Sequence, residues 1–142
     1  MMRLCACLNV PIDIIEPCGF VLTDRKLRRA GMDYLDRLDM TRHDSWRRFA
    51  ADRSADRLIV LTTAAETSYT AFQFHADDTL MVGRETAGVP EAVHDAADAR
   101  VRIPMAPGSR SLNVALAAAM VLGEALRQTG GMPATPNHQE TP

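Results

Sequence analysis

The chain has little cysteine, no long apolar run and almost no net charge. Each of these features argues against a class of protein. The three cysteines are an odd number without metal-type spacing, which favours reduced core thiols in a cytoplasmic protein over a disulfide or a zinc site. No apolar run is long enough to cross a membrane, and no basic stretch leads into an apolar one as a leader would. The formal charge of −2 does not suggest nucleic acid, although clustered basic residues can outweigh the total.

Several common enzyme signatures are also missing. The sequence has no P-loop and no G-x-G-x-x-G, which argues against kinases and dinucleotide-binding proteins. Ser109 and Ser111 do not lie in a G-x-S-x-G elbow, so a serine hydrolase is disfavoured. The four histidines are scattered along the chain, and we interpret them as surface or capping residues. An unrelated nucleotide-binding α/β protein remains a minor alternative.

The composition, with 46% hydrophobic and 24% charged residues in 142, suits one globular domain with a core of modest size. Short apolar runs alternate with helical patterns. We expect strands at 10–15, 37–40, 58–61, 80–82 and 101–103, and helices at 1–8, 24–30, 44–51, after Pro90 and at 109–127. The run 58–61 is apolar throughout, as in a strand buried on both faces. This order predicts an α/β fold with a mainly parallel sheet and helices on both faces.

Residues 80–119 contain the features that a ligand pocket needs. Two of the expected strands end in loops rich in glycine and proline, at 83–90 and 104–108. A polar group that includes Arg110 and Asn113 then begins an alanine-rich helix. Ligands of parallel α/β folds bind where the carboxyl ends of the strands meet such loops. We therefore expect a ligand site formed by this stretch.

The same stretch resembles a known family. Residues 83–90, 102–105 and 109–114 resemble the three C-terminal motifs of the SPOUT class of RNA 2′-O-methyltransferases, and 14–20 and 26–34 resemble segments of the bacterial members that modify tRNA. The resemblance implies a C-terminal deep trefoil knot that binds S-adenosylmethionine. It also implies methyl transfer to the ribose 2′-hydroxyl of the wobble nucleotide, cytidine or uridine, in the anticodon stem-loop of tRNA.

The start of the chain departs from the family pattern. Members have a first strand and an Asn-Thr-Gly loop before the helix that corresponds to residues 1–8, and we do not find these residues here. We therefore expect residues 1–128 to form an N-terminally truncated SPOUT domain, with 129–142 as a disordered tail of polar residues and proline. A catalytically impaired or non-catalytic RNA-binding protein on the same scaffold is the alternative function.

The resemblance also assigns roles to single residues. The positions that match the family's cofactor contacts are Leu61, Gly83, Ile103 and Ser111. The positions that match its active-site residues are Arg3, Glu85 and Asn113. From the residues alone, Leu61 and Ile103 would be core, Gly83 a turn and Asn113 a helix cap. An arginine is normally protonated, so we assign Arg3 first to orienting the phosphate rather than to removing a proton.

Two further features concern partners. The helix expected at 24–30 carries four cations that we interpret as tRNA phosphate contacts, with a solvated helix face as the alternative: Arg25, Lys26, Arg28 and Arg29. The last helix is apolar around most of its circumference from Leu112 to Leu122. A small chain has limited room to bury such a helix alone, so we expect a homodimer, which the resemblance also implies.

Overall fold

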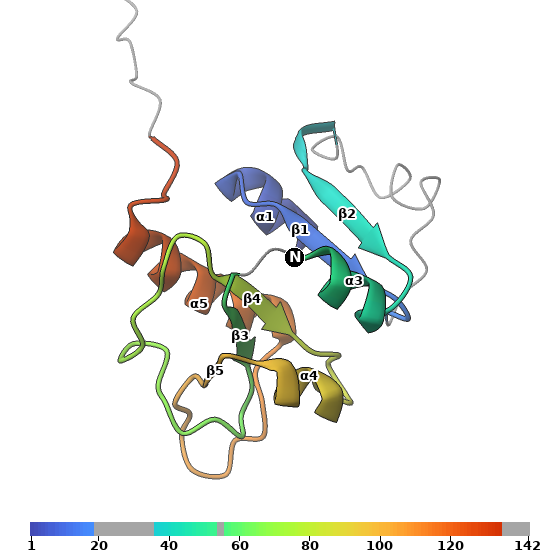
Figure 1. Ribbon diagram of the computed structural model, residues 1–142. Coiled ribbons are helices and arrows are strands. Elements are labelled where there is room, and N and C mark those ends of the chain that lie inside the picture. Colours follow the sequence, from blue (N-terminus) through green and yellow to red (C-terminus); the bar gives the residue numbers. More distant parts are fainter. Residues whose placement is uncertain (19–35, 54–55, 135–142) are drawn as a thin grey trace, which may run out of the picture.

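The structure, a computed structural model, describes residues 1–18, 36–53 and 56–134 (Figure 1). Its helices and strands follow in the order α1 (Met2–Leu8), β1 (Ile12–Ile15), β2 (Met40–His43), α3 (Trp46–Asp52), β3 (Leu58–Leu61), β4 (Thr79–Val82), α4 (Glu91–Ala96), β5 (Ala99–Val101) and α5 (Val114–Thr129). Helices and parallel strands are mixed along the chain, which confirms the predicted α/β class. The helix expected at 24–30 and residues 135–142 of the expected tail lie outside the described residues.

All strand pairs among the described residues are parallel, as predicted. Strand β3 lies between β4 and β5 in a three-stranded sheet, while β1 and β2 form a second sheet of two strands. The division into two sheets was not predicted. Leu58, Ile59 and Val60 are 0% exposed, which confirms that β3 is buried on both faces.

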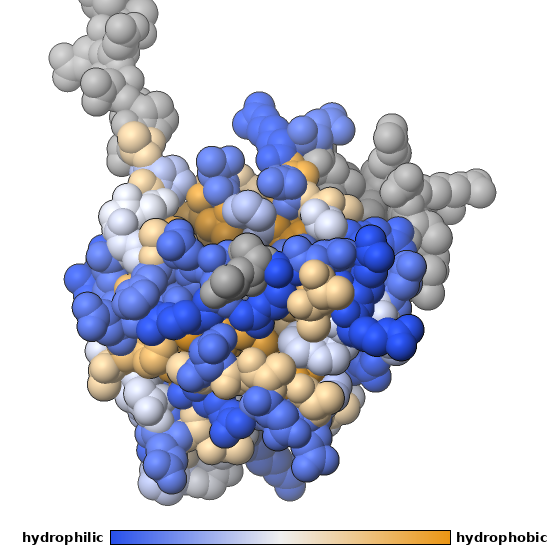
Figure 2. All heavy atoms as spheres, in the orientation of Figure 1, coloured by the Kyte–Doolittle hydropathy of each residue, from blue (hydrophilic) through white to orange (hydrophobic). Residues whose placement is uncertain are grey.

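The core explains why β3 is apolar throughout. Leu58 and Val60 point to one face, where they pack with Phe49 of α3 and Val93 of α4. Ile59 points to the opposite face and packs in a second cluster with Phe74, Val101 of β5 and Val121 of α5. Helices therefore cover both faces of this sheet, and Figure 1 shows α4 and α5 on either side of its strands. Polar side chains cover most of the outer face seen in Figure 2, with apolar patches between them.

Strand β2 lies further along the chain than predicted. The sequence suggested a strand at 37–40, but the observed strand begins at Met40 and ends at His43. The parallel ladder with β1 sets these bounds, because Ile12 pairs with Met40 and Ile15 pairs with His43. Propensity within 37–40 could not reveal a register that depends on a distant strand.

The last strand and the last helix also differ from their predicted bounds. Strand β5 ends at Val101 because Arg102 turns to the neighbouring loop: the Arg102 N–H donates to Thr67 O and the Tyr69 N–H donates to Arg102 O, both at 2.9 Å. Helix α5 begins at Val114 rather than at 109. Asn113 is its cap, with Oδ1 accepting from the N–H of Ala115 at 2.9 Å and of Leu116 at 3.3 Å. Residues 109–113 therefore form a loop.

The remaining expectations have mixed outcomes. Cys5 is buried, Cys18 is partly buried and Cys7 is exposed, and all three are free thiols. The prediction of core thiols is therefore right for Cys5 and wrong for Cys7. Within the described part of the chain, no helix is long and apolar enough to span a membrane.

Candidate functional site

The three strands of the larger sheet end side by side. Leu61, the last residue of β3, pairs with Val82 at the end of β4 and with Val101 at the end of β5. Gly83 follows β4 directly, and Ile103 follows β5 after one bridging residue. Because the strands are parallel and in this register, the predicted cofactor residues of three chain segments meet at one edge of the sheet. The predicted juxtaposition of these segments is confirmed.

The loop after β4 is closed on itself. The Arg84 N–H donates to Gly88 O at 3.0 Å, and the Gly88 N–H donates back to Arg84 O at 2.9 Å. Gly88 has φ 65°, which suits glycine. A Cβ at Gly83 would lie 2.2 Å from the carbonyl carbon of Gly88, so no side chain fits there. The close contact at Gly83 is therefore made by the loop itself, as in the turn that the residue alone suggested.

The loop places Glu85 beside Asn113. The Nδ2 of Asn113 donates to Oε1 of Glu85 at 3.4 Å, a long hydrogen bond between exposed groups. The other side of the same amide is occupied, because Oδ1 of Asn113 caps α5. Because Oδ1 is engaged in the cap, the Nδ2 side of the Asn113 amide is the side that contacts Glu85. Two residues predicted for the active site are thus brought into contact.

The other predicted residues lie at the strand ends and in the loop before α5. Leu61 and Ile103 are partly buried against the Ile59, Val101 and Val121 cluster, on the face of the sheet that α5 covers. Ser111 is exposed in the loop before Asn113. These positions offer an apolar wall, strand-end backbone groups and one hydroxyl, which fits the adenine and ribose of a nucleoside cofactor.

Arg3 lies on a different part of the structure. It is exposed on α1, whose Met2 packs against Ile14 of β1 and so belongs to the two-stranded sheet. The remaining predicted RNA contacts, Arg25, Lys26, Arg28 and Arg29, lie outside the described residues. The structure therefore brings together Glu85, Asn113 and the cofactor positions, and assigns Arg3 to the neighbouring sheet.

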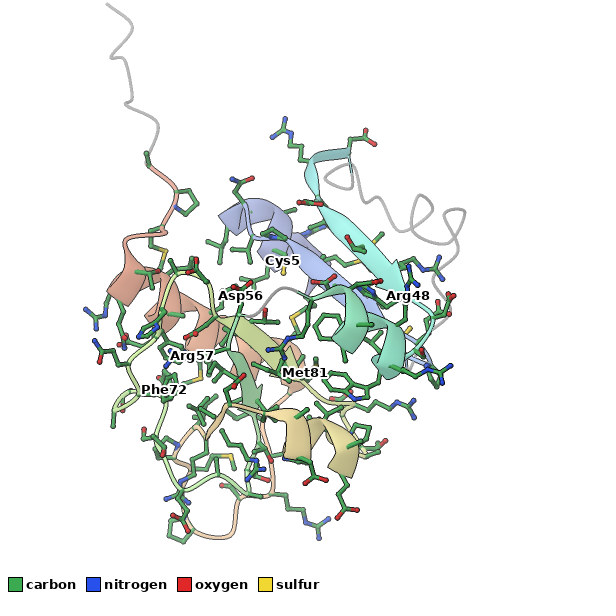
Figure 3. The ribbon with its side chains drawn as sticks, in the orientation of Figure 1. Cys5, Arg48, Asp56, Arg57, Phe72 and Met81 are labelled. Carbon is green, nitrogen blue, oxygen red and sulfur yellow. The ribbon has the colours of Figure 1, made fainter. Side chains whose placement is uncertain are left out.

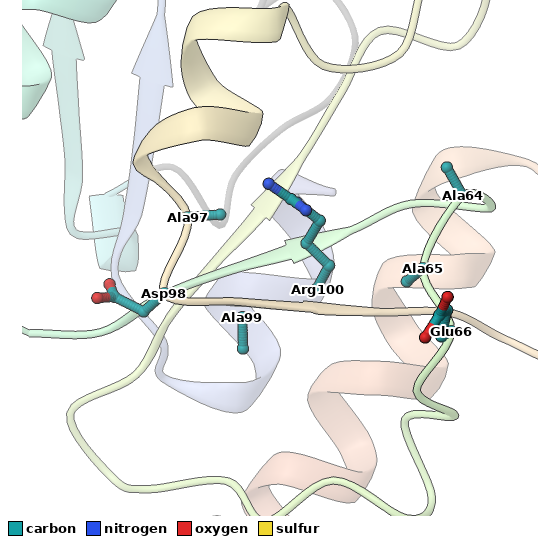
Figure 4. Close-up of a pocket in the computed structure, with 7 residues that line it drawn as sticks. All are labelled: Ala64, Ala65, Glu66, Ala97, Asp98, Ala99 and Arg100. Atoms are coloured by element: carbon teal, nitrogen blue, oxygen red, sulfur yellow. The ribbon is translucent and has the colours of Figure 1, made fainter.

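A hollow of about 340 Å³ lies elsewhere on the larger sheet. It is bordered by residues 64–66 on one side and 97–100 on the other (Figure 4). None of the residues predicted to bind cofactor lines it. We therefore locate the candidate site at the strand ends and not in this hollow. Among the residues that the structure describes, no group of three or more His, Cys, Asp or Glu side chains could hold a metal ion.

Sequence reasoning missed a buried histidine. His43 is 7% exposed, with Nε2 at 2.7 Å from Oδ1 of Asp13 and Nδ1 at 3.8 Å from Oδ2 of Asp52. The edge of its ring meets Phe49 of α3. The interpretation of all histidines as surface or capping residues is thus wrong for His43, which joins β1, β2 and α3. Nothing local in the sequence marked it, because its partners lie on other elements.

A second missed set of contacts fixes the loop that follows β3. The guanidinium of Arg57 binds Asp78 through two bonds of 2.7 Å and lies 5.4 Å from the centre of the Phe72 ring (Figure 3). Burial acts to raise the pKa of Asp78, but hydrogen bonds from Arg57 and the His75 N–H outweigh it and lower the pKa. From α5, Gln128 donates to Phe72 O at 3.0 Å and accepts from the Phe74 N–H at 2.9 Å. These contacts fix the loop between β3 and β4 to Arg57, just before β3, and to α5.

The fold is that of an RNA methyltransferase family. The sequence model of the SpoU rRNA Methylase family matches residues 1–123, and the chain belongs to this family. The chain is 60% identical over 134 residues to a tRNA (cytidine(34)-2′-O)-methyltransferase of Beijerinckia indica, an alignment that covers 93% of this chain and 84% of that protein. The enzyme of the same name from Ancylobacter novellus is 53% identical over 137 residues, with 95% and 87% covered.

Solved structures agree with the sequence comparison. A protein solved for insight into the 2-OH methylation of C/U34 on tRNA superposes with a TM-score of 0.81 at 36% identity, covering 89% of this chain and 84% of that one. The SpoU methyltransferase AviRb from Streptomyces viridochromogenes, in complex with the cofactor AdoMet, superposes with a TM-score of 0.73 at 28% identity over 89% of this chain and 53% of its own.

Proposed function

We propose that this protein transfers a methyl group from S-adenosylmethionine to the ribose 2′-hydroxyl of the wobble nucleotide, cytidine or uridine, of a tRNA. The observation that carries the proposal is the contact between Glu85 and Asn113 at the strand ends, within a chain 60% identical to an enzyme named for this reaction. The SpoU methyltransferase solved with AdoMet supports the choice of cofactor. Since the proposed substrate is a tRNA, we expect the protein to act in the cytoplasm.

The residues present fit the cofactor. S-adenosylmethionine supplies a methyl group already activated by its sulfonium. Leu61 and Ile103 provide the apolar wall for its adenine, backbone groups at Gly83 provide polar partners, and the Ser111 hydroxyl is a further donor. The task of the protein is then to hold the acceptor oxygen in line with the donor and to help remove one proton.

Glu85 and Asn113 are the residues that shape the acceptor side. Their mutual contact sets the direction of the Glu85 carboxylate, and the cap at α5 holds the Asn113 amide. Arg3 binds the phosphate next to the reactive ribose, a role that suits a permanently charged guanidinium. Arg25, Lys26, Arg28 and Arg29 contact phosphates of the anticodon stem-loop. The salt dependence of tRNA binding, compared between the wild type and an Arg28→Ala, Arg29→Ala variant, tests this last assignment.

We further propose that residues 83–127 form a deep trefoil knot. In it, residues 109–127 pass through the loop between Gly83 and Pro107. True knots are rare in proteins, and membership of the SpoU family supports this one. An experimental structure in which α5 does not pass through that loop would contradict it.

The functional unit is a homodimer formed through α5. Leu112, Leu116 and Met120 follow one another at intervals of four residues and are 40%, 63% and 42% exposed. Residues four apart lie on one face of a helix, so Leu116 and Met120 form an apolar stripe on α5, and Leu112 lies in the loop just before this helix. A second copy of this chain covers the stripe, since the stripe presents no charge for a nucleic acid and follows directly on the loop 109–113, which contains Ser111.

Transfer of labelled methyl groups to tRNA by the purified protein, with the modified nucleoside identified, tests the proposed activity. A thermal shift with S-adenosylmethionine tests cofactor binding separately. Cofactor binding without transfer would leave the fold assignment intact and contradict the proposed substrate.

A further inference from the structure

Arg84 links the loop after β4, residues 83–90, to the two-stranded sheet. We call residues 83–90 the site loop. The backbone of Arg84 closes the loop with Gly88, while its side chain leaves the loop, and Nη2 donates to the carbonyl oxygen of Pro17. Pro17 lies just after β1, 67 residues earlier in the chain. The guanidinium therefore joins the end of β4 in the three-stranded sheet to the end of β1 in the two-stranded sheet.

The Pro17 side of this contact is itself held in place. The N–H of Glu16, the residue before it, donates to His43 O at 2.9 Å, which continues the ladder between β1 and β2. The Glu16 carboxylate forms an ion pair with Arg42 of β2. His43 in turn is buried between Asp13 and Asp52. Arg84 thus reaches a carbonyl group whose position is set by several contacts.

The site loop has few other lateral supports. Residues 84–88 are all exposed, so no apolar packing fixes the tip of the loop. The base of the loop is held by the two backbone bonds between Arg84 and Gly88 and by Val89, which packs against the core cluster of Phe49. These contacts do not reach the exposed tip that carries Glu85. The hydrogen bond from Asn113 to Glu85 is already 3.4 Å long, so a small shift of the loop breaks it.

We propose that Arg84 is a positioning residue, which holds Glu85 against Asn113 by anchoring the site loop to the Pro17 carbonyl. The proposal rests on the methyl transfer proposed above for its kinetic consequences. In this role Arg84 acts through Glu85, the residue next to it, because its guanidinium donates to the carbonyl of Pro17. A misplacement of a site residue by about an ångström can cost up to two orders of magnitude in rate, so a modest anchor has a measurable effect.

The test compares Arg84→Met with Arg84→Lys and with a matched control, Arg100→Met. Arg100 also donates a side-chain N–H to a backbone carbonyl, that of His94 at 2.6 Å, but on the border of the hollow and away from the site. We expect Arg84→Met to lower kcat about tenfold with little change in melting temperature, because it removes one charged hydrogen bond. Arg84→Lys, which keeps a donor, should recover part of the rate, and Arg100→Met should leave it unchanged.

Two results would overturn the proposal. If Arg84→Met raises KM for tRNA and leaves kcat unchanged, Arg84 binds RNA directly and does not position Glu85. A double-mutant cycle gives the second criterion: in a Glu85→Ala background, Arg84→Met should reduce the rate less than twofold further. A full tenfold loss in that background would show that Arg84 does not act through Glu85.

Amide hydrogen exchange tests the anchor without any activity. Peptides covering 83–90 should exchange about tenfold faster in Arg84→Met than in the wild type, because the loop loses its link to Pro17. The Arg100→Met control should not change them. If the wild type methylates no tRNA, the proposed function fails while this measurement still decides the anchor. Unchanged exchange in Arg84→Met would show that Arg84 does not anchor the loop.

Discussion

The amide of Asn113 lies 3.4 Å from the carboxylate of Glu85, although 28 residues separate them in the chain. The contact joins the loop after β4 to the start of α5, and the same Asn113 side chain caps that helix. One residue therefore serves stability through its oxygen and the site through its nitrogen. The two roles can be separated by mutation.

Asn113→Asp keeps an oxygen for the cap but replaces the donor that meets Glu85 with a second carboxylate. We expect the melting temperature to stay close to the wild-type value, since Asp caps helices as well as Asn. Methyl transfer should fall strongly. Asn113→Ala should lose transfer and also about 1 kcal/mol of stability, the usual cost of a lost cap. Thermal unfolding and single-turnover methylation measure the two effects, and an Asn113→Asp variant that is fully active would contradict the assigned role.

Gly83→Ala tests the close approach inside the site loop. The added Cβ would lie 2.2 Å from the Gly88 carbonyl carbon, so the backbone has to move. Gly108→Ala is the matched control, because its Cβ meets no atom within 4 Å and only the left-handed backbone at φ 83° is strained, at about 1–2 kcal/mol. We expect Gly83→Ala to be the more destabilising in thermal unfolding, and also to weaken S-adenosylmethionine binding. Equal melting temperatures would mean that the loop adapts freely.

Leu116→Arg tests the dimer. Leu116 is 63% exposed in the single chain, so an arginine there can be solvated without disturbing the core. We expect the wild type to sediment as a dimer at micromolar concentration and the variant as a monomer with an unchanged melting temperature at high dilution. Arg127→Gln, on the same helix and exposed, should remain dimeric. A wild type that sediments as a monomer would contradict the prediction of a dimer.

The contacts of Glu124 with Arg127 and Gln128 should depend on pH. Hydrogen bonds from Arg127 and Gln128 lower its pKa from 4.5 to about 2. Because the folded-state pKa is depressed, the stabilisation is fully present above pH 4.5 and is lost as the pH falls toward about 2. Glu124→Gln should therefore lower the melting temperature at pH 7 but not near pH 2, relative to the wild type. A difference that does not depend on pH would show that the charge of Glu124 does not matter.

Some elements were predictable because their signal is local. The run Leu58–Leu61 reads as a buried parallel strand by composition alone, and it is the central strand β3. Strand β2 was placed three residues early, since its register depends on β1 and on the burial of His43. No local pattern encodes either of these, because both arise from contacts with distant segments.

The candidate site also combines residues that the sequence could indicate with contacts that it could not. Resemblance assigned roles to Glu85 and Asn113 one by one, but their hydrogen bond depends on the parallel register that brings β4 and α5 to one edge. The link from Arg84 to Pro17 had no sequence signal at all, because it spans two sheets and 67 residues. The sequence thus predicted which segments lie together at the candidate site, and the structure added the contacts between them.

The most direct test of the account is to incubate the purified protein with tRNA and labelled S-adenosylmethionine, and to map the methylated nucleoside. We predict a single 2′-O-methyl group on cytidine or uridine at the wobble position, absent in the Asn113→Asp variant. A wild type that binds S-adenosylmethionine but methylates another nucleotide, or none in a complete set of tRNAs, would contradict the central claim.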